Sequence, residues 1–237
     1  MSTYLTGDIH GRVDRITNFI EKMKLTEDDI IIILGDVAFN YYGDSSDAKR
    51  KKKVAKYAPT IFCIHGNHEN RASNIESYKQ KNFMGGTVWY EEAFPNIVFA
   101  VDGEVYKIPS CDGTVHDTLI CGGAYSVDKF WRIAMHYHWF SDEQPSDEIK
   151  KKVERVLETR DWQIDTILTH TGPVSAEPTE MFIKGIDQSK VDKTTEIWFQ
   201  SILEKLKSFK RWYFGHYHCN KIVDNRIRIL FEDFILF

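Results

Sequence analysis

The stretch Ile30-Ile31-Ile32-Ile33-Leu34-Gly35-Asp36 decides the architecture, because five apolar side chains lead directly into a glycine and a carboxylate. A short apolar run that ends at a turn residue is typical of a strand buried on both faces. Comparable runs occur at four other places in the chain: Thr3–Leu5, Ile61–Ile64, Ile167–Leu168 and Trp212–Phe214. We expect these five segments to form buried strands of the fold.

Segments with helical periodicity lie between these strands. Apolar side chains recur every three or four residues along three segments, which cover residues 13–23, 149–157 and 199–206. Ser146 precedes Asp147 and Glu148, which suits the start of a helix because acidic side chains in the first turn meet the positive end of the helix dipole. This alternation of strands and helices indicates an α/β architecture.

The middle of the chain has a different pattern, with short strand-like runs separated by turn signals. Residues 97–101, 104–108 and 114–121 are such runs, and the first two are separated by Asp102-Gly103. They predict an antiparallel meander. The C-terminal segment repeats the pattern with residues 220–223 and 226–231 around Asp224-Asn225. We therefore expect two mixed β-sheets packed face to face and flanked by helices.

Composition and charge limit the class of protein. The chain has 237 residues, 42% hydrophobic and 28% charged, which is typical of one soluble globular domain over residues 1–237. The net charge of -4 indicates no nucleic-acid surface, and we expect the basic run Lys49–Lys53 on a solvated helix face. No apolar run approaches the roughly 20 residues of a membrane span, and we expect no signal peptide. Four cysteines without paired spacing favour a cytoplasmic location.

Five polar segments each place an Asp, Asn or His directly after an expected strand. They are Gly7-Asp8-Ile9-His10-Gly11, Gly35-Asp36, Gly66-Asn67-His68-Glu69, Thr169-His170 and Gly215-His216-Tyr217-His218. Such a residue taken singly is more often a turn former or a helix cap. Loops beyond the carboxyl ends of strands meet at one edge in α/β sheets, and carboxylate, carbonyl and imidazole groups are ligands of divalent metals. The five segments together therefore predict one metal centre.

The order of these motifs, Asp-x-His, Gly-Asp, Gly-Asn-His, His and Gly-His-x-His, resembles that of the calcineurin-like metallophosphoesterases. The resemblance implies a two-metal centre on a four-layer α/β/β/α sandwich. By position it assigns one ion to Asp8, His10 and His218, the other to Asn67, His170 and His216, and a bridging role to Asp36. It also assigns His68 to the substrate. The segment Gly122–Lys129 is similar to one in compact bacterial and phage-borne members of this superfamily.

This resemblance implies a reaction. Two ions about 3.5 to 4 Å apart can generate a bridging hydroxide near neutral pH and stabilise an in-line displacement at phosphorus. His68, beside the ligand Asn67, is then placed to protonate the leaving alkoxide or to stabilise charge on the phosphoryl oxygens. We expect Mn²⁺, although Fe and Zn accept the same ligands. The sequence therefore predicts a phosphoesterase for small-molecule phosphoesters, nucleotides included.

The second motif departs from the Ser/Thr protein phosphatases, which otherwise have similar signatures at residues 7–11 and 66–69. Where that branch has Asp-Arg-Gly, this chain has Phe39 and Asn40, so the Asp that orients the catalytic His and a phosphate-binding Arg are both absent. We expect Asn40 and Arg71 at the substrate, because a guanidinium matches phosphate oxygens bidentately, with Arg12 and Arg132 as alternatives.

Two other functions stay open at this point, a Ser/Thr/Tyr protein phosphatase and a non-catalytic scaffold that retains the fold. The presence of every ligand together with His68 argues against the scaffold. The choice between monoester and diester, the natural substrate and the oligomeric state are not predicted.

Overall fold

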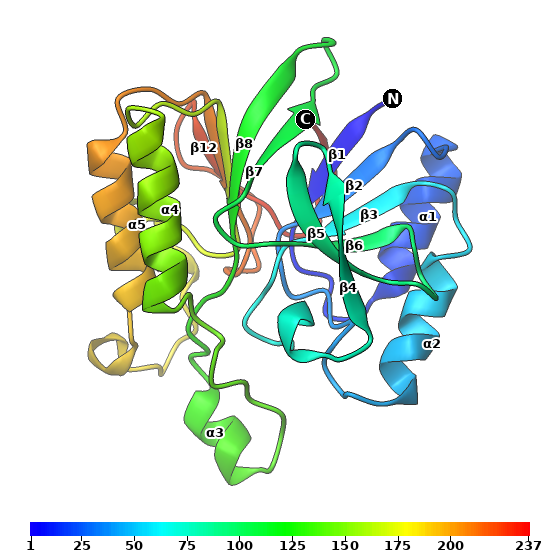
Figure 1. Ribbon diagram of the computed structural model, residues 1–237. Helices are drawn as coiled ribbons and strands as arrows, with labels where there is room; N and C mark the ends of the chain where they lie inside the picture. Colours follow the sequence, from blue (N-terminus) through cyan, green and yellow to red (C-terminus); the bar gives the residue numbers. More distant parts are fainter.

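Two β-sheets lie face to face in the computed structural model, which describes residues 1–237, and helices cover their outer faces (Figure 1). The first sheet has seven strands in the order β13-β1-β2-β3-β6-β5-β4. Its strands are β1 (Thr3–Thr6), β2 (Ile30–Ile33), β3 (Thr60–Cys63), β4 (Tyr78–Phe83), β5 (Gly86–Glu91), β6 (Ile97–Ala100) and β13 (Ile235–Leu236). The pairs between β1, β2, β3 and β6 are parallel, and the other pairs are antiparallel.

The second sheet has six strands in the order β11-β12-β10-β9-β8-β7. Its strands are β7 (Val105–Pro109), β8 (Val115–Cys121), β9 (Thr166–Thr169), β10 (Arg211–Phe214), β11 (Lys221–Ile222) and β12 (Ile227–Ile229). The central pairs β8–β9, β9–β10 and β10–β12 are parallel, whereas β7 and β11 are antiparallel edge strands. The prediction of two mixed sheets flanked by helices is confirmed.

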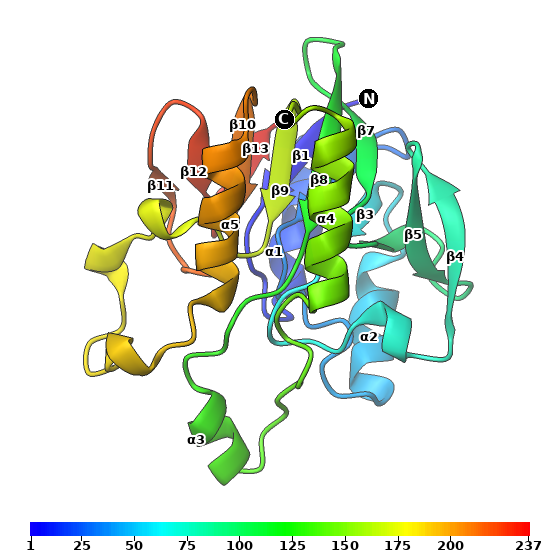
Figure 2. The ribbon, with the colours of Figure 1, turned by 60° about the vertical axis from the view of Figure 1, so that its left-hand side comes forward.

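The helices divide between the two outer faces. They are α1 (Val13–Met23), α2 (Ser45–Val54), α3 (Lys129–Ala134), α4 (Asp147–Thr159) and α5 (Thr194–Lys205), with short 3₁₀ turns at Ala72–Asn74, Val174–Ala176, Thr179–Met181 and Gln188–Lys190. Figures 1 and 2 show α1 and α2 beside the first sheet, α4 and α5 beside the second, and α3 projecting from one end of the sandwich. Ser146 caps α4 as predicted, because its hydroxyl accepts a hydrogen bond from the Ile149 amide. None of the helices is both long and apolar enough to cross a bilayer.

The isoleucine run of β2 shows why the sheets stack. Successive side chains of a strand point to opposite faces, so Ile31 and Ile33 pack in the cluster under α1, while Ile30 and Ile32 pack in the cluster between the sheets. All four are at most 2% exposed. Burial on both faces therefore requires a helix layer on one side and a second sheet on the other.

Two local expectations were wrong, and two features of the first sheet were not predicted. Residues 97–121 do not form one meander, because β6 pairs in parallel with β3 of the first sheet, whereas β7 and β8 pair in the second sheet. The hairpin of β4 and β5 and the short β13 were not predicted. Within the basic run on α2, Lys51 is buried at 6% exposure and forms an ion pair with Glu91, so one member of the run faces inward.

Candidate metal centre

The five polar segments meet at one end of the sandwich, because each follows the carboxyl end of a parallel strand: β1, β2, β3, β9 or β10. Hydrogen bonds connect the segments. An oxygen of Asp8 accepts a bond from the amide of His216 at 2.9 Å, and one of Asp36 accepts from the amide of His68 at 2.8 Å. The first sheet supplies three segments and the second sheet two, so the centre spans both sheets.

One group of donors consists of Asp8, His10 and His218. The Nε2 atoms of His10 and His218 lie 2.8 Å apart. Oδ2 of Asp8 lies 3.3 Å from Nε2 of His218 and 3.8 Å from Nε2 of His10. Asp8 is fully buried, and its Oδ2 makes no hydrogen bond. A buried carboxylate oxygen without a partner is costly, and a cation bound by these three groups removes that cost.

The second group consists of Asn67, His170 and His216. The Oδ1 of Asn67 lies 2.8 Å from Nε2 of His170 and 3.1 Å from Nδ1 of His216, and its amide nitrogen donates to Ser126. Nδ1 of His170 lies 2.7 Å from the carbonyl of Leu34, which assigns the imidazole proton to Nδ1. Nε2 of His170 is then the ring nitrogen that faces the amide oxygen of Asn67. An imidazole nitrogen and an amide oxygen are both ligand atoms for a divalent cation.

Asp36 lies between the two groups and is 1% exposed. Its Oδ1 is 3.7 Å from Nε2 of His170, and its Oδ2 is 3.8 Å from Nε2 of His10. One oxygen of the same carboxylate therefore faces each group. The donor set of carboxylate, amide oxygen and imidazole fits two divalent cations that share Asp36.

The pKa values of these ligands agree with cation binding. Burial and the neighbouring His170 lower the pKa of His216 to about 3, so the imidazole is neutral and its lone pair is available. Burial raises the pKa of Asp8, but the neighbouring imidazoles of His218, His170 and His10 outweigh it and hold the pKa below its ordinary value. Asp8 is therefore ionised in spite of its burial.

Backbone strain is concentrated in the same loops. Four of the seven proposed ligands have positive φ, with 45° at His10, 48° at Asp36, 65° at His216 and 49° at His218. A residue other than glycine in the left-handed region costs about 1–3 kcal/mol, and such residues cluster at functional sites. Gly35 is required by packing as well, because a Cβ there would lie 2.1 Å from Nδ1 of His170.

His68 follows the proposed ligand Asn67 in sequence, and its side chain lies beside the guanidinium of Arg132. Its Nε2 is 3.5 Å from Nη2 of Arg132, a residue of α3. The Nε of Arg132 donates to both carboxylate oxygens of Asp128 at 2.8 Å, and its Nη1 donates to the hydroxyl of Tyr41 at 3.1 Å. Burial lowers the pKa of His68. Sequence reasoning offered Arg132 only as an alternative; it singled out the segment Gly122–Lys129 without a role for Asp128, and it missed Tyr41.

The other substrate candidates lie elsewhere. Arg71 pairs with Asp102 and donates to the carbonyl of Asp142, next to a different cavity. Asn40 faces away from the metal ligands and accepts a hydrogen bond from the Tyr78 hydroxyl at 2.9 Å. Arg12 pairs with Glu232 on the surface. Of the three arginines considered, Arg132 is the one that lines the cavity of the metal ligands.

That cavity has a volume of about 500 Å³. Five of the seven proposed ligands line it, together with His68 and Arg132; these ligands are His10, Asp36, Asn67, His216 and His218. The segment between β9 and α5 contributes apolar side chains, Phe182, Ile183 and Val191 among them, together with the charged side chains of Glu177, Asp192 and Lys193. Apolar surface in the same cavity as the proposed ligands suits an ester with a charged group and an organic leaving group.

Comparisons with known proteins bear on the fold and on the family of this chain. Among solved structures, the chain is similar to the protein TT1561 of Thermus thermophilus, with a TM-score of 0.50 and 10% sequence identity, covering 96% of this chain and 87% of that one. At this identity the likeness bears on the fold alone. No curated protein matches the sequence. The family model of the calcineurin-like phosphoesterases matches residues 1–220, and the chain therefore belongs to this family of metal-dependent phosphoester hydrolases.

Proposed function

We propose that this protein hydrolyses small-molecule or nucleotide phosphoesters with two divalent metal ions, Mn²⁺ above all. Asp8, His10 and His218 would hold one ion, Asn67, His170 and His216 the other, and Asp36 would be shared by both. The observation that carries the proposal is the inward-facing donor set, in which Asp8 Oδ2 is buried without a partner and Asn67 Oδ1 lies 2.8 Å from Nε2 of His170 and 3.1 Å from Nδ1 of His216. Bound ions would activate water for attack on phosphorus and offset the charge of the phosphoryl oxygens.

Two residues beside the proposed ligands would bind the phosphoryl group and protonate the leaving group. Arg132 is held by Asp128 and Tyr41, so its guanidinium is fixed before substrate binds. It is placed to bind the phosphoryl oxygens, because guanidinium and phosphate match in geometry and charge. His68 is placed to donate a proton to the leaving oxygen, which avoids release of a strongly basic alkoxide.

The substrate class follows from the walls of the cavity. Phe182, Ile183 and Val191 offer apolar surface to an organic leaving group. Phe39, at the position where the protein phosphatase branch has the Asp that orients its histidine, is fully buried in the core under α1. Both observations favour small esters over phosphoproteins.

The test is an activity panel on the purified protein. Mn²⁺, Fe²⁺ and Zn²⁺ are each supplied with an aryl phosphate monoester, an aryl phosphate diester, a cyclic nucleotide and a phosphopeptide. We expect the highest turnover with Mn²⁺ and a small ester, and loss of turnover in Asp8→Asn. Preference for the phosphopeptide would indicate a protein phosphatase, and no turnover with any metal would refute the proposal.

A further inference from the structure

Exposed apolar side chains border the metal cavity. Val127 lies in the loop between β8 and α3, and Met181 and Ile183 lie in the segment between β9 and α5, which is the yellow loop of Figure 2. These residues are 38%, 55% and 65% exposed, in this order. A single exposed apolar residue is ordinary, but several that line one cavity mark a surface that a ligand or a partner covers.

The free apolar surface of this cavity is mostly aliphatic. Ile186 and Val191 of the same segment also line it. The ring of Phe182 is already in contact with two neighbours: its centroid lies 6.1 Å from that of Tyr217, with 16° between the ring planes, and 5.1 Å from Nζ of Lys193. Branched and flexible side chains without a flat face fit an aliphatic group better than a planar ring.

The charged side chains of the segment are bound to their neighbours. Glu177 accepts a hydrogen bond from Nζ of Lys193 at 2.7 Å. Asp192 accepts from the amide of Thr194 at 2.9 Å and from the side chain of Gln144 at 3.0 Å. A ligand therefore meets paired charges here, and a polar group buried against this segment loses hydrogen bonds to water without replacing them.

This apolar surface adjoins the groups that would bind phosphate. Val127 directly precedes Asp128, which accepts two bonds at 2.8 Å from Nε of Arg132. On the other side, Phe182 stacks on Tyr217, the residue between the last two proposed ligands in sequence. An ester whose phosphoryl group binds at Arg132 and the metal ligands therefore places its leaving group against the apolar surface.

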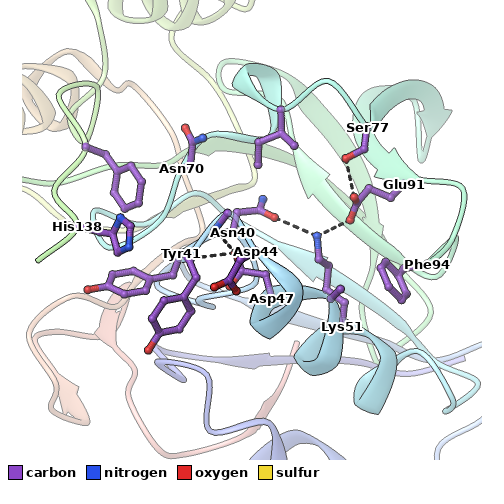
Figure 3. A pocket seen from close by; sticks show the side chains of 15 residues that line it. Asn40, Tyr41, Asp44, Asp47, Lys51, Asn70, Ser77, Glu91, Phe94 and His138 are labelled. Carbon is purple, nitrogen blue, oxygen red and sulfur yellow. Dashed lines mark hydrogen bonds and ion pairs between the residues drawn. The ribbon is translucent and has the colours of Figure 1, made fainter.

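The cavity beside α2, of about 380 Å³, has no comparable surface. Figure 3 shows Lys51 bonded to Asn40 and to Glu91, so polar side chains of this cavity bind one another. Tyr42 is the exposed large apolar residue of its lining, at 42%, and the guanidinium of Arg50 lies 4.8 Å from the centroid of its ring. The exposed aliphatic side chains therefore distinguish the metal cavity from this one.

We infer that the metal cavity takes phosphoesters with an aliphatic leaving group, which Val127, Met181 and Ile183 cover. This rests on the proposed function, because the phosphoryl group has to bind beside the metal ligands, and it narrows the small-molecule or nucleotide esters of that proposal to aliphatic ones. Contact between the aliphatic group and these side chains removes apolar area of both from water. A nucleobase would bring the polar edge of its ring against the same side chains and lose hydrogen bonds.

The experiment uses alkylphosphonates, which carry a C–P bond in place of the ester bond and are therefore not hydrolysed. Methyl-, propyl-, hexyl- and phenylphosphonate are titrated into the Mn²⁺-loaded protein by calorimetry and are tested as inhibitors of aryl phosphate hydrolysis. A methylene that is half to fully buried raises affinity about two- to fourfold. Hexylphosphonate should therefore bind at least about tenfold more tightly than methylphosphonate, and about threefold more tightly than phenylphosphonate, which has six carbons in a flat ring.

Three variants locate the surface. Met181→Gln combined with Ile183→Thr keeps the length of one side chain and the branching of the other but makes both polar, and the preference for hexyl over methyl should fall at least about fivefold. Both residues are exposed, so the thermal midpoint should stay close to that of the wild type. Ile197→Thr is the matched control, because Ile197 is 61% exposed on α5 and does not line the cavity. Gln188→Ala removes a neutral polar side chain from the same segment of the lining, and the preference should stay within about twofold.

Equal affinity for methyl- and hexylphosphonate, with the aryl ester still hydrolysed, would overturn this inference and leave the proposed function standing. Tighter binding of phenylphosphonate than of hexylphosphonate would indicate a planar leaving group, and a loss in Gln188→Ala would indicate a polar one; either result would overturn the inference. So would equal losses in Ile197→Thr and in the double variant. The absence of both turnover and phosphonate binding would overturn the proposed function, and this inference with it.

Discussion

Replacing Glu196 by Gln should stabilise the protein at neutral and alkaline pH but not at acid pH. Glu196 lies on α5 at the metal cavity and is 4% exposed. Its Oε1 accepts a hydrogen bond from Thr171 at 2.9 Å, whereas its Oε2 has no partner. Burial and the nearby charge of Glu177 raise the pKa of Glu196 from 4.5 to about 7. The native state therefore disfavours the charged carboxylate.

The size and sign of the effect follow from this pKa. Each unit is worth about 1.4 kcal/mol, so a rise from 4.5 to about 7 corresponds to at most about 3 kcal/mol. Between these two pH values the native state binds more protons than the unfolded state, and the free energy of unfolding falls as pH rises. Above about pH 7 the penalty is complete. Gln is neutral throughout and carries no such penalty.

Urea denaturation of both proteins with Mn²⁺ present, at intervals from about pH 4.5 to 8.5, measures this difference. The gain of Glu196→Gln over the wild type should be close to zero at about pH 4.5 and should reach about 1–3 kcal/mol at about pH 8. Glu204→Gln, on the exposed face of the same helix, controls for the change of net charge. A gain of Glu196→Gln that is the same at all pH values would refute the reasoning.

Four further variants test the metal centre. His68→Ala should lower kcat by about 10²–10⁴ with metal content unchanged, measured by steady-state kinetics and elemental analysis; normal turnover would remove His68 from the reaction. Arg132→Met should raise KM and lower kcat for small esters because it removes a phosphate contact, and unchanged kinetics would exclude that contact. Asp36→Asn should leave fewer than two Mn²⁺ ions per chain, and full occupancy would contradict the shared carboxylate. Gly35→Ala places a Cβ 2.1 Å from Nδ1 of His170 at a φ of 96°, so thermal denaturation should show a loss above about 1 kcal/mol; wild-type stability would argue against the close approach.

The buried strands and the meeting of the five polar segments at one end of the sandwich were predictable because each segment is a local pattern. The isoleucines of β2 leave few options for a segment that must bury both faces, and the glycine and carboxylate that follow mark its end. The hairpin of β4 and β5 was missed for the opposite reason. Its first strand, Tyr78–Phe83, is mostly polar and lies at the sheet edge, where one face meets solvent and alternation is weak.

The surroundings of the metal ligands were less predictable, because they depend on tertiary packing. Arg132 lies 64 residues from His68 in sequence, on a six-residue helix without a buried side chain, so no apolar periodicity marks its position. Asn40 follows the second motif in sequence, yet its side-chain oxygen accepts hydrogen bonds from Lys51 of α2 and from the Tyr78 hydroxyl of β4. Neither orientation follows from residue type or spacing.

The proposed metal centre takes its ligands from both sheets, so metal content bears on how completely a preparation of the protein is folded. Asp36 and Asn67 follow strands of the first sheet, whereas His170 and His216 follow strands of the second. The complete donor set exists only after the two sheets have docked, so ions bound by the proposed ligands would connect the two halves of the core. By mass action, such binding would shift the folding equilibrium toward the docked form. Metal content per chain would then measure the fraction of molecules that have finished folding.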